Sequence, residues 1–303
     1  SKSKRWRITD GDPVAAAALA RALAVPPLVA ALLVRRDCHT AEDVRTFLDA
    51  PLTGLHDPRE MLGMHAAVDR LRTAVTRREP ILVCGDYDVD GVSGTALLVA
   101  GLRRAGAEVG YIVPRRLEHG YGLHPSIVEQ GAAEGARVLV TVDLGVSAHD
   151  AVALARTRWM DVIICDHHLP YRSAGLPPAT AVLNPRQVGC AYPFKELCGV
   201  GIAFKLLQAL FGQAAWEELW PLLDLVAVGT IADLVPLLGE NRILVKHGLI
   251  QLAGTTRPGL RALADVAGIA LSSPEGIAAG RVAFGLAPRI NAAGRLDDAT
   301  VAI

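Results

Sequence analysis

The chain has 303 residues, of which 51% are hydrophobic and 20% are charged. This balance excludes an intrinsically disordered chain and predicts about two globular domains, or one large α/β domain with an appendage. Basic and acidic residues both number 31, so the net charge of zero gives no overall attraction to nucleic acid or membrane, and a phosphate-rich partner needs local patches or metal ions.

The first 62 residues are predicted to form a small helical segment. Asp12, followed by a proline, is the expected N-cap of its first helix, and Thr40 that of its third. The apolar stretch 14–34 is long enough to span a membrane, but Arg21 and a Pro-Pro pair interrupt it, so two packed helices are expected instead. The predicted helices cover residues 14–24, 28–35 and 40–48.

Apolar runs then alternate with helical patterns. This alternation predicts an α/β fold with a mainly parallel sheet flanked by helices. The expected elements are a helix over 64–78, a strand over 81–84, a helix over 92–105, a strand over 109–113, a helix over 125–135, a strand over 138–142, a helix over 148–156, strands over 162–165 and 181–183, and a helix over 199–211. From residue 216 onward we expect mostly helix, with turns at Pro221, Pro236, Pro258 and Pro274.

Acidic residues follow three of the predicted strands. Ligands of an open parallel sheet bind outside the carboxyl ends of its strands, so these side chains are expected to converge. Converging carboxylates repel one another unless a cation neutralises them, and neighbouring imidazoles favour manganese, magnesium or a similar ion. The sequence therefore predicts a divalent-metal site formed by Asp86, Asp88, Asp143 and the run Asp166-His167-His168.

Each of these motifs also has a structural interpretation. The run 86–91 is not a calcium loop of the EF-hand type, because the glutamate that closes such a loop is absent. Asp90 is expected to organise the turn before the next helix, or to cap that helix, rather than to bind metal. Asp233 lies in an apolar run, where it is either a buried helix cap or the partner of a cation. His167 and His168 should point to opposite sides, so that one ligates metal and the other faces a substrate phosphate.

No export signal is predicted. The five cysteines lie at irregular spacings without a CxxC pair, so neither a zinc site nor a disulfide framework is expected. The basic start, residues 1–7, is not followed by the uninterrupted apolar segment of a signal peptide. We expect a cytoplasmic protein that does not associate with membranes.

The order of its motifs makes the chain similar to the DHH phosphoesterase superfamily and, within it, to the RecJ family of bacterial single-stranded-DNA-specific exonucleases. The resemblance covers nearly the whole chain. Its markers are GDYDVDG at 85–91, VPRR at 113–116, GYG at 120–122, TVD at 141–143, DHH at 166–168, NP at 184–185, GVG at 199–201, GTIAD at 229–233 and PRINAAGR at 288–295.

The resemblance implies a two-metal centre for stepwise 5′-to-3′ hydrolysis of single-stranded DNA to mononucleotides, in recombination and repair. Asp143 would bridge two manganese or magnesium ions, His168 would face the scissile phosphate, and Asp90 and Asp166 would be structural. Two such ions can activate water and stabilise the leaving oxygen. The implied metal ligands are Asp86, Asp88, Asp143, His167 and Asp233.

The resemblance also implies substrate contacts and a domain organisation. Arg289 and Arg116 would bind phosphate, Tyr121 would stack on a base, and Asn291 would contact substrate, although a solvated surface charge is the alternative for each arginine. The implied parts are an N-terminal segment (1–62), a DHH catalytic domain (63–240) and a helical extension (241–303) leading toward an absent DHH-associated domain. Single-strand-binding protein and a RecQ-type helicase are the implied protein partners.

Two departures from the family pattern are present. Leu144 stands where relatives commonly have Asn, and Cys84 stands where some members have a metal-binding His. Cys is a poor ligand for manganese, so Cys84 is interpreted as the last strand residue. Two other functions remain open: a DHH phosphodiesterase acting on short oligonucleotides or cyclic dinucleotides, and a non-catalytic replication scaffold.

Overall fold

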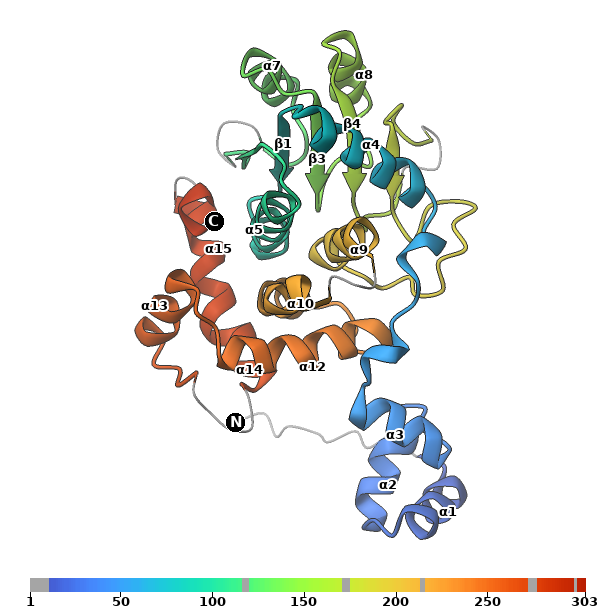
Figure 1. Ribbon diagram of the computed structural model, residues 1–303. Coiled ribbons are helices and arrows are strands. Elements are labelled where there is room, and N and C mark those ends of the chain that lie inside the picture. Colours follow the sequence, from blue (N-terminus) through green and yellow to red (C-terminus); the bar gives the residue numbers. More distant parts are fainter. Residues whose placement is uncertain (1–10, 116–119, 171–174, 213–215, 272–276, 297–298) are drawn as a thin grey trace, which may run out of the picture. The chain divides into compact units, whose positions relative to one another are not determined.

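The computed structural model describes residues 11–115, 120–170, 175–212, 216–271, 277–296 and 299–303. The chain forms two compact units, Ser1–Gly54 and Leu55–Ile303. The three-part division at residues 62 and 240 stays a prediction. Figure 1 shows the elements of both units.

The first unit is a small helical bundle. Asp12 accepts hydrogen bonds from the first turn of the first helix, and Thr40 and Asp43 form a reciprocal capping box at the start of the third, so both predicted N-caps are confirmed. Leu19 and Leu33 are buried in the core of the unit. Its helices are α1 (Pro13–Leu23), α2 (Pro27–Val34) and α3 (Ala41–Asp49), followed by a short 3-10 helix, Leu52–Gly54. Among the described helices, none is long and apolar enough to cross a membrane.

The second unit is built on a parallel sheet, which confirms the predicted α/β class. Its strand order is β2-β1-β3-β4-β5, and all neighbouring strands run parallel. The strands are β1 (Ile81–Gly85), β2 (Val109–Ile112), β3 (Val138–Val142), β4 (Asp161–Cys165) and β5 (Ala181–Leu183). Each lies within one residue of its predicted bounds, because the buried apolar runs mark these strands clearly.

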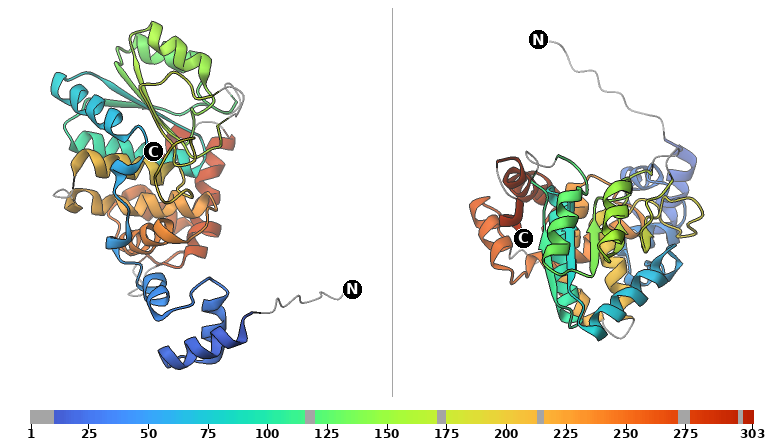
Figure 2. Two further views of the ribbon diagram at one scale, coloured as in Figure 1. Left: turned by 90° about the vertical axis from the view of Figure 1, so that its right-hand side faces the viewer. Right: turned by 90° about the horizontal axis from the view of Figure 1, so that it is seen from above.

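Helices cover both faces of the sheet (Figures 1 and 2). Alternate strand residues point to opposite faces. Leu82 and Leu139 therefore pack with α7 and α8, whereas Val83 and Val140 pack with α4, α5 and α9. These helices are α4 (Met64–Arg77), α5 (Val89–Arg104), α7 (Pro125–Ala133), α8 (His149–Thr157) and α9 (Gly199–Phe211).

A further helical layer packs on α5 and α9, as the side view in Figure 2 shows. Its elements are α10 (Trp216–Leu219), the 3-10 turn Trp220–Leu222, α11 (Leu223–Ala232), α12 (Gly239–Ala253), α13 (Pro258–Val266), α14 (Ala279–Arg281), the π-helix Val282–Leu286, α15 (Ala287–Leu296) and the 3-10 turn Ala299–Ala302. Pro258, a predicted turn, is the first residue of α13, a position that proline favours. Pro274 lies outside the described residues.

A fully buried ion pair joins α9 to α12. Lys205 Nζ lies 2.6 Å from Glu240 Oε1, and both side chains are completely inaccessible to solvent. The Tyr192 hydroxyl donates to Glu240 Oε2 at 2.7 Å. The backbone of His56, between Gly54 and the 3-10 helix Pro58–Glu60, donates to Glu240 and accepts from Lys205. This network was not predicted, and it fixes the start of the second unit to its helical layer.

Candidate metal centre

The sheet register aligns three acidic residues. Gly85 pairs with Val142, and Val142 pairs with Cys165. The residues that follow these three are Asp86, Asp143 and Asp166, and their backbone N–H groups continue the ladder. The carboxyl ends of β1, β3 and β4 therefore place these side chains next to one another, as the sequence predicted.

Two further aspartates join them from helix ends. Asp88 is the N-cap of α5, and its Oδ1 accepts hydrogen bonds from the N–H groups of Asp90 (3.0 Å) and Gly91 (3.1 Å). Its second oxygen is not used by this cap. Asp233 occupies the C-cap position of α11 through its backbone, whose N–H donates to the Gly229 carbonyl, and its Oδ2 is buried and unpaired. Asp88 therefore caps a helix and still offers one oxygen, and Asp233 offers its unpaired Oδ2.

Asp86, Asp88, Asp143 and Asp233 line a cavity of about 330 Å³. Its walls come from the β1–α5 loop, the ends of β3, β4 and α11, the loop before α7, and α15. The lining residues are Asp86, Tyr87, Asp88, Tyr121, Asp143, His168, Asp233, Asn291 and Arg295.

His167 lies among the carboxylates. Its Nε2 is 3.2 Å from Asp143 Oδ1 and 3.8 Å from Asp233 Oδ2, but no hydrogen bond joins these atoms. Within the described residues, Asp86 Oδ1, Asp143 Oδ1, Asp233 Oδ2 and both ring nitrogens of His167 are buried without a hydrogen-bond partner. Unpaired buried oxygen and imidazole ligands fit a divalent cation such as manganese or magnesium.

Burial, together with mutual repulsion, raises the pKa values of the acids. Burial, with the neighbouring Asp88 charge, raises the pKa of Asp86 to about 7 and that of Asp233 to about 6. Burial and the nearby carboxylates raise the pKa of Asp143 well above its ordinary value. Burial, with the His168 charge, lowers the pKa of His167 to about 4, so this ring is neutral with a free lone pair. A cation would relieve the repulsion among the acids.

Unlike His167, His168 has a hydrogen-bond partner for its ring. Its Nδ1 lies 2.7 Å from Asp166 Oδ1, and this hydrogen bond raises the pKa of the imidazole. Burial opposes ionisation of Asp166, but the hydrogen bonds from His168 and from the Val146 N–H together hold its pKa below the ordinary value. Asn184 donates to the His168 carbonyl oxygen at 2.8 Å. His168 thus lines the cavity as an oriented, readily protonated side chain.

Asp90 does not cap the helix that it was predicted to precede. Because Asp88 is the N-cap, α5 begins at Val89 rather than at residue 92, and Asp90 lies inside its first turn. Its carboxylate instead accepts hydrogen bonds from Gly199 and Val200, the first two residues of α9.

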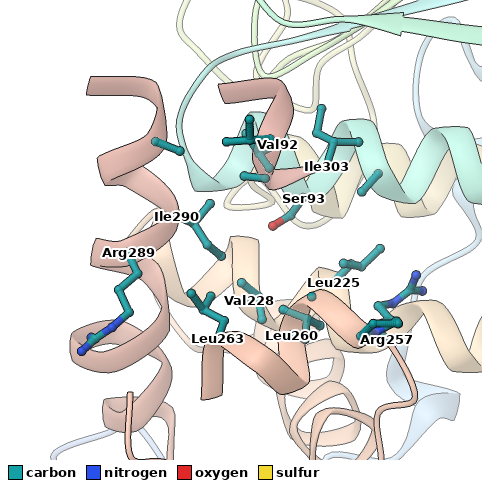
Figure 3. A pocket seen from close by; sticks show the side chains of 16 residues that line it. Val92, Ser93, Leu225, Val228, Arg257, Leu260, Leu263, Arg289, Ile290 and Ile303 are labelled. Carbon is teal, nitrogen blue, oxygen red and sulfur yellow. The ribbon is translucent and has the colours of Figure 1, made fainter. Parts of the chain in front are cut away.

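The predicted substrate residues are only partly brought together. Asn291 lines the cavity and accepts a hydrogen bond from the Val89 N–H at 3.1 Å, and Tyr121 contacts His168 through its hydroxyl at 3.2 Å. Arg116 lies outside the described residues. Arg289 is at the edge of a separate apolar cavity of about 430 Å³ and donates to the Gly285 carbonyl (Figure 3).

Arg295 lines the metal cavity and was missed as a site residue. Its spacing of four from Asn291 was the available signal, because residues i and i+4 share one face of a helix. Arg289, two positions before Asn291, falls on another face of α15. The structure therefore favours Arg295 over Arg289 as the arginine of this cavity.

The two departures from the family pattern do not line the cavity. The side chains of Cys84 and Leu144 are fully buried in the apolar cluster between the sheet and helices α7 and α8. Burial raises the pKa of the Cys84 thiol to about 12, which keeps it protonated. Cys84 is a strand residue, as the sequence predicted, although β1 continues one residue further.

A family model described as the DHH family, N-terminal domain, matches residues 80–230, the segment that contains every predicted metal ligand except Asp233. The chain belongs to the DHH family. The single-stranded-DNA-specific exonuclease RecJ of Bacillus subtilis is 42% identical over 301 residues, 99% of this chain and 37% of that protein. The Escherichia coli RecJ is 41% identical over 292 residues, 92% of this chain and 49% of that protein.

Solved RecJ structures are also similar to this chain. RecJ of Thermus thermophilus in complex with Mn²⁺ matches with a TM-score of 0.82 at 35% identity, covering 98% of this chain and 42% of that one. The Mg²⁺ complex of the same protein matches with a TM-score of 0.71. The chain thus spans half or less of the length of these relatives.

Proposed function

We propose that this chain is the catalytic portion of a metal-dependent exonuclease that hydrolyses single-stranded DNA from its 5′ end to mononucleotides. The observation that carries the proposal is the set of unpaired, buried ligand atoms at the carboxyl end of the sheet. It is supported by the 42% identity to a RecJ exonuclease over almost the whole chain.

In this proposal the metal ligands are Asp86, Asp88, Asp143, His167 and Asp233. Two bound manganese or magnesium ions would supply an activated water and neutralise the charge of the scissile phosphate. The chain's own residues hold the ions and orient the scissile phosphate. His168 donates through Nδ1 to Asp166, so its Nε2 proton is available to a phosphate or leaving oxygen.

On the proposed substrate side, Arg295 and Asn291 of α15 bind phosphate oxygens, and Tyr121 offers a ring surface to a base. The protein partners, single-strand-binding protein and a RecQ-type helicase, are proposed from the family resemblance alone. A cytoplasmic location is also proposed, and the five cysteines, none of which forms a disulfide, support it.

The test is degradation of single-stranded DNA that carries a label at the 5′ end in one sample and at the 3′ end in another. With Mn²⁺ we expect immediate release of a labelled mononucleotide from the 5′-labelled strand only, and no release with EDTA. A matched duplex and a cyclic dinucleotide complete the assay. Hydrolysis of the dinucleotide alone would replace this proposal with the phosphodiesterase function, and an inert protein that binds no Mn²⁺ would favour a scaffold.

Mn²⁺ is expected to raise the thermal unfolding midpoint more at pH 8 than at pH 6. At pH 6 the Asp86 carboxyl, with a pKa of about 7, is mostly protonated, and the Asp233 carboxyl, with a pKa of about 6, is partly protonated; these protons must leave before metal binds. Because these pKa values are raised above those of the unfolded chain, the metal-free protein loses stability as the pH rises through this interval. Calorimetry with and without Mn²⁺ measures both effects, and equal Mn²⁺ shifts at the two pH values would contradict the expectation.

The Arg295→Ala variant is expected to raise the KM for single-stranded DNA by about tenfold to a hundredfold, because it removes a charged hydrogen-bond donor from the cavity. Arg289→Ala is the matched control, since this residue is on the same helix but outside the cavity. Steady-state kinetics at saturating Mn²⁺ makes the comparison. A larger effect from Arg289 would return the phosphate contact to the originally predicted residue.

A further inference from the structure

Asp90, like Asp166 but unlike Asp86, Asp143 and Asp233, already has a hydrogen-bond partner on each of its oxygens. Oδ2 accepts from the Gly199 N–H at 2.6 Å and Oδ1 from the Val200 N–H at 2.8 Å. The N-cap residue of α9, Cys198, makes no side-chain cap of its own. Asp90, which is 1% exposed, therefore supplies the missing cap from another part of the chain.

This cap holds α9 directly against Asp143. A Cβ atom on Gly199 would lie 2.6 Å from the Cβ and 2.9 Å from the Cα of Asp143, so only glycine permits the approach. Asp143 has a φ of +64°, in the left-handed region that few residues adopt. The first turn of α9 is thus in close contact with the left-handed backbone that carries the Asp143 carboxylate.

Asp90 also borders the other side of the centre. Its Oδ2 is 4.0 Å from His167 Nε2. Gly229, one turn before Asp233, lies against it, since a Cβ there would be 3.2 Å from Asp90 Oδ1. One buried carboxylate therefore lies against α11, which carries Asp233, lies 4.0 Å from His167, and reaches Asp143 through Gly199.

We propose that Asp90 is a positioning residue of the metal centre: it ties the N-terminus of α9 to α5 and thereby fixes Asp143, without itself ligating metal. The inference rests on the proposed function. The competing assignment is a ligand role, because Asp90, His167 and Asp233 could by spacing hold an ion. As a ligand, however, Asp90 would have to share or release the hydrogen bonds that cap α9.

The test measures Mn²⁺ affinity and the number of ions bound per chain by calorimetry. Asp90→Asn keeps the shape of the side chain but turns an amide group toward a backbone N–H donor. Gly199→Ala changes no possible ligand but displaces Asp143, with a Cβ that would also lie 3.0 Å from Asp90 Oδ2. Gly201→Ala is the matched control in the same helix, because the three atoms nearest to its Cβ would all belong to the Leu197 and Cys198 side chains.

We expect Asp90→Asn and Gly199→Ala to weaken Mn²⁺ binding by about 10- to 100-fold with an unchanged number of ions, as expected for groups that support metal ligands, and Gly201→Ala to bind like the unaltered chain. Circular dichroism verifies that each variant is folded. If Asp90→Asn does not fold, the comparison of the two glycine variants decides.

Two results would overturn the inference. In the first, Asp90→Asn binds one ion fewer, as a ligand variant such as Asp143→Asn should. In the second, Gly199→Ala binds Mn²⁺ as tightly as Gly201→Ala. If the unaltered chain binds no Mn²⁺, the proposed function itself fails, which is a distinguishable outcome.

Discussion

The Asp143→Asn variant is expected to lose Mn²⁺-dependent DNA hydrolysis by on the order of 10³-fold or more, because it removes a charge from the centre of the ligand set. Asp143, like His167, belongs to two of the three ligand groups: one with His167 and His168, and the other with Asp86 and Asp88. Its Oδ1 is buried and unpaired, and its side chain is 4% exposed. No other acid that lines the cavity belongs to two of these groups.

Asparagine is the appropriate replacement because of the backbone at this position. With a φ of +64°, alanine would add strain, whereas asparagine adopts this conformation readily. A loss of activity in Asp143→Asn can therefore be attributed to the carboxylate rather than to misfolding. Asp69→Asn, in an exposed part of α4, is the control. Full hydrolysis by Asp143→Asn with Mn²⁺ would show that the assigned ligand set is wrong.

The Glu240→Gln variant is expected to lower the free energy of unfolding by about 3–5 kcal/mol, because it leaves the Lys205 ammonium buried without its counter-charge. Lys205→Met should be destabilising for the complementary reason. The double variant should lose less free energy of unfolding than the two single variants lose together, since neither charge then remains unpaired. Urea unfolding of the metal-free protein measures all three.

Arg158→Met provides the comparison for this prediction, because it breaks an ion pair with Glu129 whose partners are both about half exposed. Solvent screens this pair, so its loss should leave the unfolding midpoint unchanged. If Glu240→Gln were as stable as the unaltered chain, the buried network would not anchor α9 and α12.

The sequence was informative where local rules decide the structure. Buried apolar runs marked the strands, and the acids after β1, β3 and β4 converge because parallel strands end at one edge of the sheet. Asp12 and Thr40 were identifiable as caps because each hydrogen-bonds within its own helix.

Such local rules could not predict contacts between distant segments of the chain. Asp90 was predicted to act on its own helix, yet it caps α9, which begins more than 100 residues later. Lys205 and Glu240 gave no sequence signal, because neither periodicity nor a motif relates two charges on separate helices. Arg295 was identifiable only through its spacing of four from Asn291, which places the two residues on one face of a helix, and the cavity then confirmed that both line it.

The ligand set described above is dispersed along the chain, from Asp86 in the β1–α5 loop to Asp233 at the end of α11. No short segment can assemble it, so an unfolded chain has no preformed site and the ions bind almost only after the sheet and α11 have closed. Metal binding should therefore act on the lifetime of the native state: it would slow unfolding while leaving the rate of refolding nearly unchanged.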